Sequence, residues 1–389
     1  MNKASAIQQS IPDPPSRSEV VRLKAGLLCE GLFPNPVAQA ICQRQNPCED
    51  WKTGNVGIHF AFETGSHVLA TVDHTFNRDS GFSLESNEAH LVLLERGTAV
   101  CRVAEIAMPS WYKESTSMCG DMSGLFLHEG RAFLHQTYSG CDYYATKMQC
   151  MFCSAGPKWR IGTPSEIGEV VSRALAENPA YHVCLGGGTR VPIERNVAYF
   201  SECAEQIRKA NPRVPIWVEM VPPDSDEEIL RMVEAGVTSF GFNIELWDDK
   251  RRQELCPAKA LVSKTRYLSA MEYALEVLGP NRVGSCLMAG LEPLQSSIRG
   301  CCVLASIGVQ PCVLPFKPWD GSDHAAEGCC TPNNLVEISR SAVRAMIANG
   351  VSPAENQGCL RCDACTIDHD VYELEVESNG GNAHAHSGS

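Results

Sequence analysis

A chain of 389 residues is longer than one average domain and has room for one barrel and an accessory module. Apolar residues make up 44% of it and charged residues 20%, as in ordinary water-soluble globular proteins. The sequence contains no run of about 18 apolar residues and no apolar core of a secretory signal, so we expect a cytoplasmic protein with no membrane partner. The net charge of −13 disfavours a nucleic-acid partner, because such a surface repels phosphates.

The cysteine content is unusual, because twenty cysteines are far more than a cytosolic chain of this size ordinarily carries. In a reducing compartment such thiols bind soft metals or clusters, or take part in redox chemistry. The alternative is that many are small buried apolar residues. We expect this of about half, including Cys184, Cys203 and Cys286, which lie within apolar runs.

The first third of the chain has no chemical motif. Residues 1–20 are polar and contain prolines, so a flexible leader is expected. Residues 21–130 combine a short helical piece with alternating apolar segments separated by Gly, Asn and Asp. This period-two pattern predicts a small β-rich accessory module.

Residues 131–325 alternate between short apolar runs and amphipathic stretches, which predicts strands and helices in turn. The predicted strands are Phe133–Tyr138, Tyr181–Leu185, Ile216–Met220, Ser239–Ile244, Arg282–Met288 and Gln310–Leu314. The predicted helices are Ser165–Glu177, Val197–Ala210, Asp226–Ala235, Lys264–Leu278 and Pro293–Ile307. The fold class is therefore α/β, a partial (β/α)6 barrel, with its chemistry at the carboxyl ends of the strands.

Three cysteines follow the first predicted strand of this barrel. Cys141, Cys150 and Cys153 are spaced Cys-x8-Cys-x2-Cys. Three thiolates can hold three corners of a [4Fe–4S] cluster and leave the fourth iron open for chemistry. The alternative is a structural zinc site, which His135 would complete.

With these cysteines, the chain resembles the radical S-adenosylmethionine (radical SAM) enzymes, whose three cysteines follow the first strand of a partial barrel. Phe152 occupies the place of the aromatic residue before the last cysteine. The segment Gly186, Gly187, Gly188 and Thr189, after the second strand, is similar to the family's Gly-Gly-Glu segment, which meets the amino group of SAM.

Later strand ends extend the resemblance over about residues 131–320. Asn243 and Glu245 end the fourth strand at the place of the family's ribose and carboxylate contacts, and Glu292 follows the fifth in the position of its adenine-side motif. The sixth strand, VLPFKPWDGS, is similar to the family's Pro-rich segment. The chain departs from the family in its longer first cysteine gap and in Gly188, which stands where the family has Glu.

The C-terminal part changes character again. Residues 326–370 are predicted to form a Cys-rich extension, and residues 371–389 a disordered tail of acidic, Gly, Asn and His composition. Cys359, Cys362 and Cys365 are spaced Cys-x2-Cys-x2-Cys, which suits zinc, a second iron–sulfur cluster or trivalent arsenic. The layout resembles the radical SAM family of arsinothricin biosynthesis, which transfers the 3-amino-3-carboxypropyl group of SAM onto arsenite.

The resemblance implies a [4Fe–4S] cluster, SAM and an electron donor such as flavodoxin or ferredoxin. An electron from the cluster would break one carbon–sulfur bond of SAM. Cleavage toward the amino-acid side would transfer the 3-amino-3-carboxypropyl group to a small-molecule or inorganic substrate, here a thiophilic acceptor. Cleavage toward the ribose would instead lead to hydrogen abstraction, with a second cluster at the C-terminal cysteines. A zinc-stabilised protein without catalytic activity is the alternative from another class.

Overall fold

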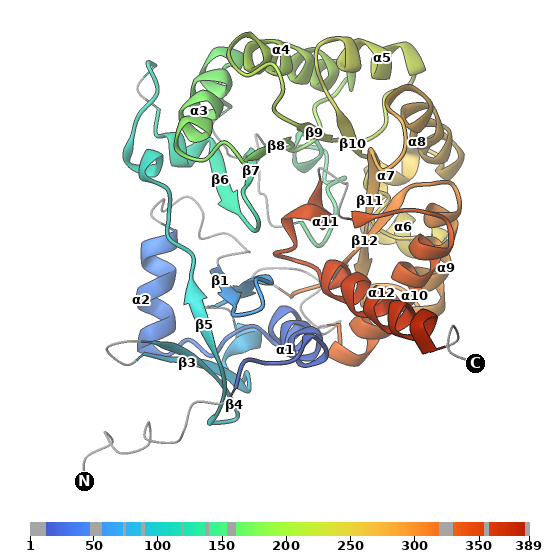
Figure 1. Cartoon of the computed structure of the whole chain (residues 1–389). Coiled ribbons are helices and arrows are strands. Elements are labelled where there is room, and N and C mark those ends of the chain that lie inside the picture. Colours follow the sequence, from blue (N-terminus) through green and yellow to red (C-terminus); the bar gives the residue numbers. More distant parts are fainter. Residues whose placement is uncertain are drawn as a thin grey trace.

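The structure, a computed structural model, describes residues 13–46, 57–72, 75–86, 90–118, 120–136, 140–153, 161–318, 330–353 and 358–385. Two sheets organise it (Figure 1). One has seven strands in the order β12-β11-β10-β9-β8-β7-β6, and the other has five in the order β2-β1-β5-β4-β3. One hydrophobic core continues from the smaller sheet into the larger, so the accessory module is packed against the barrel.

The larger sheet is a curled half-barrel of parallel strands. It contains the six predicted strands, which are confirmed with slightly different ends: β7 Phe133–Gln136, β8 His182–Leu185, β9 Ile216–Glu219, β10 Ser239–Gly241, β11 Val283–Ala289 and β12 Gln310–Pro315. Their runs read as continuous apolar segments because helices cover the outside of the sheet. Figure 1 shows these helices as an outer ring, with the C-terminal α11 inside it.

The five predicted helices of the barrel are also confirmed. They are α3 Pro164–Glu177, α4 Glu194–Ala210, α5 Asp226–Glu234, α8 Lys264–Leu278 and α9 Leu294–Ser306. The α3 helix begins where its capping box predicts, because the Thr163 hydroxyl accepts from the Glu166 amide and the Glu166 carboxylate accepts from the Thr163 amide. Two short helices between β10 and α8 were not predicted, α6 Asp249–Leu255 and α7 Pro257–Leu261.

The barrel begins earlier than the sequence suggested. The strand β6, Phe126–Glu129, pairs antiparallel with β7 and forms the edge of the barrel sheet. The boundary drawn after residue 130 therefore falls within a hairpin. The turn of this hairpin places Gly130 and Ala132 at positive φ. Because the turn is short, amino-acid composition does not show that β6 belongs to the barrel and not to the preceding module.

The N-terminal module is β-rich, as expected. It contains α1 Arg17–Glu30, α2 Pro36–Gln45 and five antiparallel strands, β1 Gly57–Phe62, β2 His67–Thr71, β3 Phe82–Ser86, β4 Leu91–Glu95 and β5 Thr98–Glu105. The single-turn 3-10 helices are η3 Thr75–Asn77, η4 Ser110–Lys113, η5 Met122–Gly124 and, in the barrel, η6 Asp142–Tyr144. The predicted leader is too long, because Ser16 caps α1 and Val20 is already buried. Residues 1–12 lie outside the described part.

The C-terminal extension forms α10 Pro332–Ala348, α11 Cys359–Cys362 and α12 Asp368–Ala385. The prediction of a disordered segment from residue 371 is wrong for the start of that segment, because Val371 is buried and α12 continues to residue 385. Residues 386–389 lie outside the described part. Among the described helices, none has both the length and the apolar composition needed to cross a bilayer.

Buried charges join the two ends of the chain. Lys24 in α1 is fully buried, and its ammonium donates to Asp363 at 2.7 Å and to Asp370 at 2.8 Å. Arg131, at the start of the barrel, lies 3.3 Å from the second oxygen of Asp363. These contacts fix the segment between α11 and α12 against α1, because an unpaired charge in this interior would be costly.

Candidate active site

A cavity of about 450 Å³ lies where the parallel strands of the barrel end. Residues of both modules line it. The barrel contributes strand ends and the loop with the first three cysteines, whereas the N-terminal module contributes side chains such as His59 and Leu69. The N-terminal module therefore forms part of the wall of the cavity. Ligand sites in parallel α/β sheets gather at this end of the strands.

The structure places Cys141, Cys150 and Cys153 together at the wall of this cavity. All three thiols are partly exposed. The amide of Asp142 donates to the carbonyl of Thr189 at 2.9 Å, which ties Cys141 to the loop after β8. The amide of Cys153 donates to the carbonyl of Cys150 at 3.0 Å, so the last two cysteines share one tight turn.

This arrangement fits a cluster better than a single zinc ion. The ligands of one tetrahedral zinc ion stand about 3.5–4 Å apart. Within the described residues, Cys141, Cys150 and Cys153 do not form a group with all ligand atoms within 4.8 Å of one another. His135, expected to complete a zinc site with them, lies instead in a group with Cys184 and Glu219. Thiolates on separate irons of a cluster stand further apart, which suits these three cysteines.

Two neighbours of the Cys150 thiol favour its ionised form, although the residue packs against an apolar cluster. A hydrogen bond from the buried Cys256 thiol lowers the pKa of Cys150, and the ammonium of Lys259 lowers it further against the effect of burial. The same hydrogen bond raises the pKa of Cys256 well above the usual value. A ligand of iron must be a thiolate, so both neighbours prepare Cys150 for that role. Cys256 itself is buried against this predicted cluster ligand.

Asn243 and Glu245 line the same cavity. The side-chain oxygen of Asn243 accepts from the amide of Cys286 at 3.0 Å, which fixes its orientation. Glu245 adopts a φ of 68°, a conformation that costs a non-glycine residue energy and is frequent at functional sites. Its carboxylate accepts from the ammonium of Lys259 at 2.5 Å.

Lys259 was not predicted as a site residue. It lies on α7, lines the cavity and points to the segment after β10, where its ammonium also donates to the carbonyl of Asn243 at 3.3 Å. Burial opposes its charge, but Glu245 and the Cys150 thiolate hold its pKa well above the usual value. A fixed positive charge thus lies between a strand end and the cysteine loop. The short segment ELCPAKA carries no motif that would have identified it.

The structure shows why Gly188 stands where the family has Glu. A Cβ atom at Gly188 would lie 2.0 Å from the carbonyl oxygen of Gly140 and 2.5 Å from the Cβ of Cys141. No side chain fits there, because the cysteine loop passes directly over it. Gly187, Gly188 and Thr189 line the cavity, whereas Gly186 lies beside His135 and Glu219.

Of the two remaining predicted SAM contacts, one lines the cavity and the other does not. Phe152 lines the cavity and packs beside a small apolar cluster that contains Leu291 and Phe316. Glu292 does not line it. Its carboxylate accepts from the amide of Asp248 at 2.6 Å and from the Ser297 hydroxyl at 2.8 Å, so it holds the start of α9 to the loop before α6.

The C-terminal cysteines are distributed unequally. Cys365 lines the cavity, and burial raises the pKa of its thiol to about 11. Cys362 is buried in an apolar cluster with Phe133, Cys184 and Trp217. The side chain of Cys359 lies outside the described part, so the expected group of three stays a prediction.

Comparisons with known proteins identify one family and several similar proteins. The profile of the Radical SAM superfamily matches residues 136–293. A curated relative, the bacteriochlorophyllide c C-7(1)-hydroxylase of Chlorobaculum limnaeum, is 26% identical over 216 residues, which are 49% of this chain and 53% of the relative. The chain thus spans about half the length of that relative.

Solved structures with a similar arrangement include HydG, a maturase of the [FeFe]-hydrogenase. It is 13% identical, with 63% of this chain and 58% of HydG covered and a TM-score of 0.46. The coproporphyrinogen III oxidase HemN of Escherichia coli, a radical SAM enzyme, is 12% identical, with 62% and 60% covered and a TM-score of 0.40.

Proposed function

Because this chain belongs to the radical SAM superfamily, whose members use a [4Fe–4S] cluster and SAM, we propose that it transfers the 3-amino-3-carboxypropyl group of SAM to a thiophilic acceptor such as arsenite. The single observation that carries this proposal is the shared cavity. Cys141, Cys150 and Cys153 line one wall, and Cys365 from the C-terminal extension lines the same space. The thiophilic acceptor and SAM can then be bound within one enclosed volume.

The cluster, when bound, supplies one electron to the sulfonium of SAM and so opens a carbon–sulfur bond. The thiolates of Cys141, Cys150 and Cys153 would hold it. Lys259 and Glu245 form a fixed dipole beside it, which suits the carboxylate and amino groups of the methionine part of SAM. Asn243, held by the amide of Cys286, adds a fixed amide group at the same strand end. An external one-electron donor such as flavodoxin or ferredoxin is needed to reduce the cluster.

Cys365 is suited to an arsenite acceptor. Its raised pKa keeps the thiol protonated at neutral pH. A protonated thiol condenses with an As–OH group, so that an As–S bond forms, an As–O bond breaks and the thiol proton leaves in water. Trivalent arsenic prefers thiolate sulfur, as soft ions do. The apolar cluster that contains Cys362 borders this position, which limits competition from water.

The second candidate is hydrogen abstraction by a 5′-deoxyadenosyl radical, which leaves 5′-deoxyadenosine as the by-product, with a second iron–sulfur cluster at the C-terminal cysteines. The observation that favours it is the similarity to the bacteriochlorophyllide c C-7(1)-hydroxylase of Chlorobaculum limnaeum. This reaction needs no thiol at the acceptor position. The two candidates therefore differ in their dependence on Cys365.

The test follows an isotopic label from SAM. The full chain is reconstituted anaerobically with iron and sulfide, reduced, and supplied with arsenite and SAM labelled only in the carbons of its 3-amino-3-carboxypropyl group. We expect a labelled organoarsenical from the wild type, and loss of at least about 90% of it from Cys365→Ser, with Cys302→Ser, a change at an exposed thiol, as the control. An organoarsenical yield that is equal in all three proteins would contradict the role of Cys365, and the absence of any labelled arsenical would contradict the transfer.

A further inference from the structure

Three adjacent strands of the barrel bring a nitrogen, a sulfur and an oxygen donor to one place. His135 is on β7, Cys184 on β8 and Glu219 on β9. His135 is the direct cross-strand neighbour of Cys184, and Cys184 is that of Trp217. Trp217 precedes Glu219 by two residues on β9. Because side chains alternate along a strand, the two side chains lie on the same face of the sheet. Register alone therefore directs all three donors to the inner face of the barrel.

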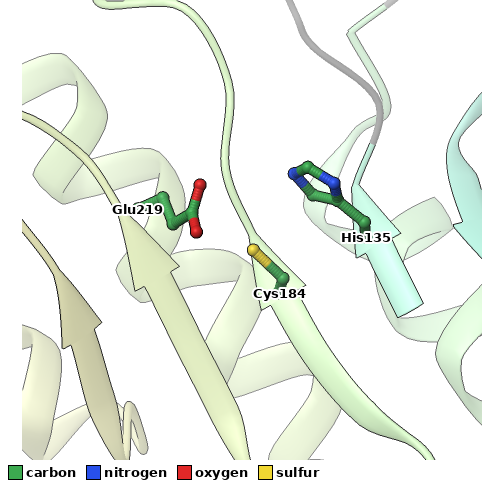
Figure 2. A group of neighbouring side chains, drawn as sticks. All are labelled: His135, Cys184 and Glu219. Carbon is green, nitrogen blue, oxygen red and sulfur yellow. The ribbon is translucent and has the colours of Figure 1, made fainter. Parts of the chain in front are cut away.

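The three donors are close enough to bind one ion. Their ligand atoms all lie within 4.8 Å of one another. Figure 2 shows the thiol of Cys184 between the imidazole of His135 and the carboxylate of Glu219, all extending into the same space. A Cβ atom built on Gly186 would lie 3.6 Å from Nε2 of His135 and 3.7 Å from the sulfur of Cys184, so both atoms face one point.

Each of the two outer donors is held from behind by a second group. Nδ1 of His135 lies 3.3 Å from the carboxylate of Glu129, which leaves Nε2 as the nitrogen directed toward the thiol. The indole N–H of Trp217 donates to Oε1 of Glu219 at 3.0 Å. A carboxylate behind a histidine and a donor behind a carboxylate are the outer-sphere contacts that orient metal ligands in proteins.

Trp217 itself is held in a slot of glycines. A Cβ atom at Gly241 would lie 2.8 Å from the indole ring, and one at Gly358 would lie 2.6 Å from it. Neither position tolerates a larger residue without movement of the ring. The indole is 3% exposed, so the orientation of Glu219 is determined by the packing of the barrel interior.

We propose that His135, Cys184 and Glu219 bind one divalent borderline metal ion, of which zinc is the probe, with its fourth position open to the cavity. Three protein ligands and one open position are the pattern of catalytic zinc sites. A thiolate and a carboxylate together carry two negative charges, which balance the ion. His135 and Glu219 line the cavity while Cys184 lies behind them, so the open position takes water or a substrate oxygen.

The donor set distinguishes this ion from others. Magnesium and calcium prefer oxygen ligands alone, so a thiol and an imidazole in the donor set disfavour both. The proposed site is separate from the cluster cysteines and does not depend on which bond of SAM is cleaved. Its failure would leave the proposed function intact.

The deciding measurement is X-ray absorption at the zinc edge. One equivalent of zinc is added to the full chain after anaerobic reconstitution of its cluster. We expect one sulfur neighbour at about 2.3 Å and nitrogen and oxygen neighbours at about 2.0–2.1 Å. Two or more sulfur neighbours would place zinc on the other cysteines and overturn the proposal, as would failure to retain zinc.

Variants locate the ion. Cys184→Ala is expected to remove the sulfur neighbour, whereas Cys312→Ala, a change at another buried strand cysteine outside the cavity, keeps it. Glu129→Gln leaves the ligands in place and is expected to weaken zinc binding about 10- to 100-fold. If Cys184→Ala does not fold, the zinc-edge spectrum of the wild type and the zinc affinity of Glu129→Gln test the site instead. Unchanged zinc affinity in Glu129→Gln, together with a sulfur-free spectrum of the wild type, would contradict the site.

Discussion

The two cysteine groups of this chain share a Cys-x2-Cys spacing but lie in opposite environments. Cys150 and Cys153 occupy an open turn at the wall of the cavity, where a neighbouring thiol and Lys259 favour the thiolate. Cys362 and Cys365 flank Asp363, which is buried against Lys24. The first environment suits a reactive group that exchanges electrons and ligands. The second fixes a protein segment in place and presents one thiol, Cys365, to the cavity.

The largest effect is expected from removal of a cluster ligand. Cys150→Ala should lose the iron–sulfur absorbance after reconstitution and all cleavage of SAM, because two thiolates do not hold the cluster. Cys256→Ala, which removes the neighbouring thiol, should retain the cluster. Iron and sulfide analysis of both variants checks this. Loss of iron from Cys256→Ala with retention in Cys150→Ala would exchange the roles of the two residues.

The environment of Cys362 and Cys365 is tested through the buried charge of Lys24. Lys24→Met leaves Asp363 and Asp370 without their shared cation, so the free energy of unfolding should fall by about 3–5 kcal/mol. Arg22, on the same helix as Lys24, forms an exposed ion pair with Glu95 of β4, and Arg22→Ala should cost less than about 1 kcal/mol. Denaturant unfolding measures both. Equal small losses would mean that the buried pairs do not hold the C-terminal segment.

A smaller effect is expected from the cation beside the cluster cysteines. Lys259→Met removes the partner of Glu245 and should weaken SAM binding about 10- to 100-fold, the range for a lost charged hydrogen bond. The exposed Lys250→Met on α6 is the matched control. Equilibrium binding of SAM to the reconstituted protein compares them. Unchanged affinity in Lys259→Met would remove Lys259 from the SAM site.

The last expected effect depends on pH. Burial raises the pKa of Asp368 to about 6, although its carboxylate accepts from the amide of Val313 at 2.7 Å. Because this pKa lies above the unfolded value, the contribution is complete below pH 4 and is lost as the pH rises through 6. About 3 kcal/mol is involved. Asp368→Asn should therefore gain stability relative to the wild type between pH 4 and 7, and a difference that does not change with pH would contradict this.

Much of the barrel could be predicted because its strands and helices are marked by short, contiguous sequence patterns. Buried parallel strands are short apolar runs, and capping residues such as Thr163 mark where helices begin. The strand β6 was missed because its pairing depends on the hairpin turn at Gly130. The start of α12 was missed because a polar composition conceals the contacts that bury Val371.

The site divides in the same way. The cysteine loop, Asn243 and Glu245 line the cavity and could be selected from the sequence because they follow predicted strands. Lys259 was missed because its helix is too short to predict from the sequence. Glu292 lies in a segment similar to a family motif, but its carboxylate accepts from Asp248 and Ser297 outside the cavity. Cys184 was predicted to be a buried core thiol. It is buried, but only strand register shows that His135 and Glu219 lie beside it.

The most direct test of the central claim is the by-product of SAM. The reconstituted, reduced wild-type protein is incubated with SAM and arsenite, and the nucleosides are separated and identified by mass. Transfer of the 3-amino-3-carboxypropyl group predicts 5′-methylthioadenosine in amounts equal to the arsenical product. Formation of 5′-deoxyadenosine alone would contradict that claim and favour hydrogen abstraction.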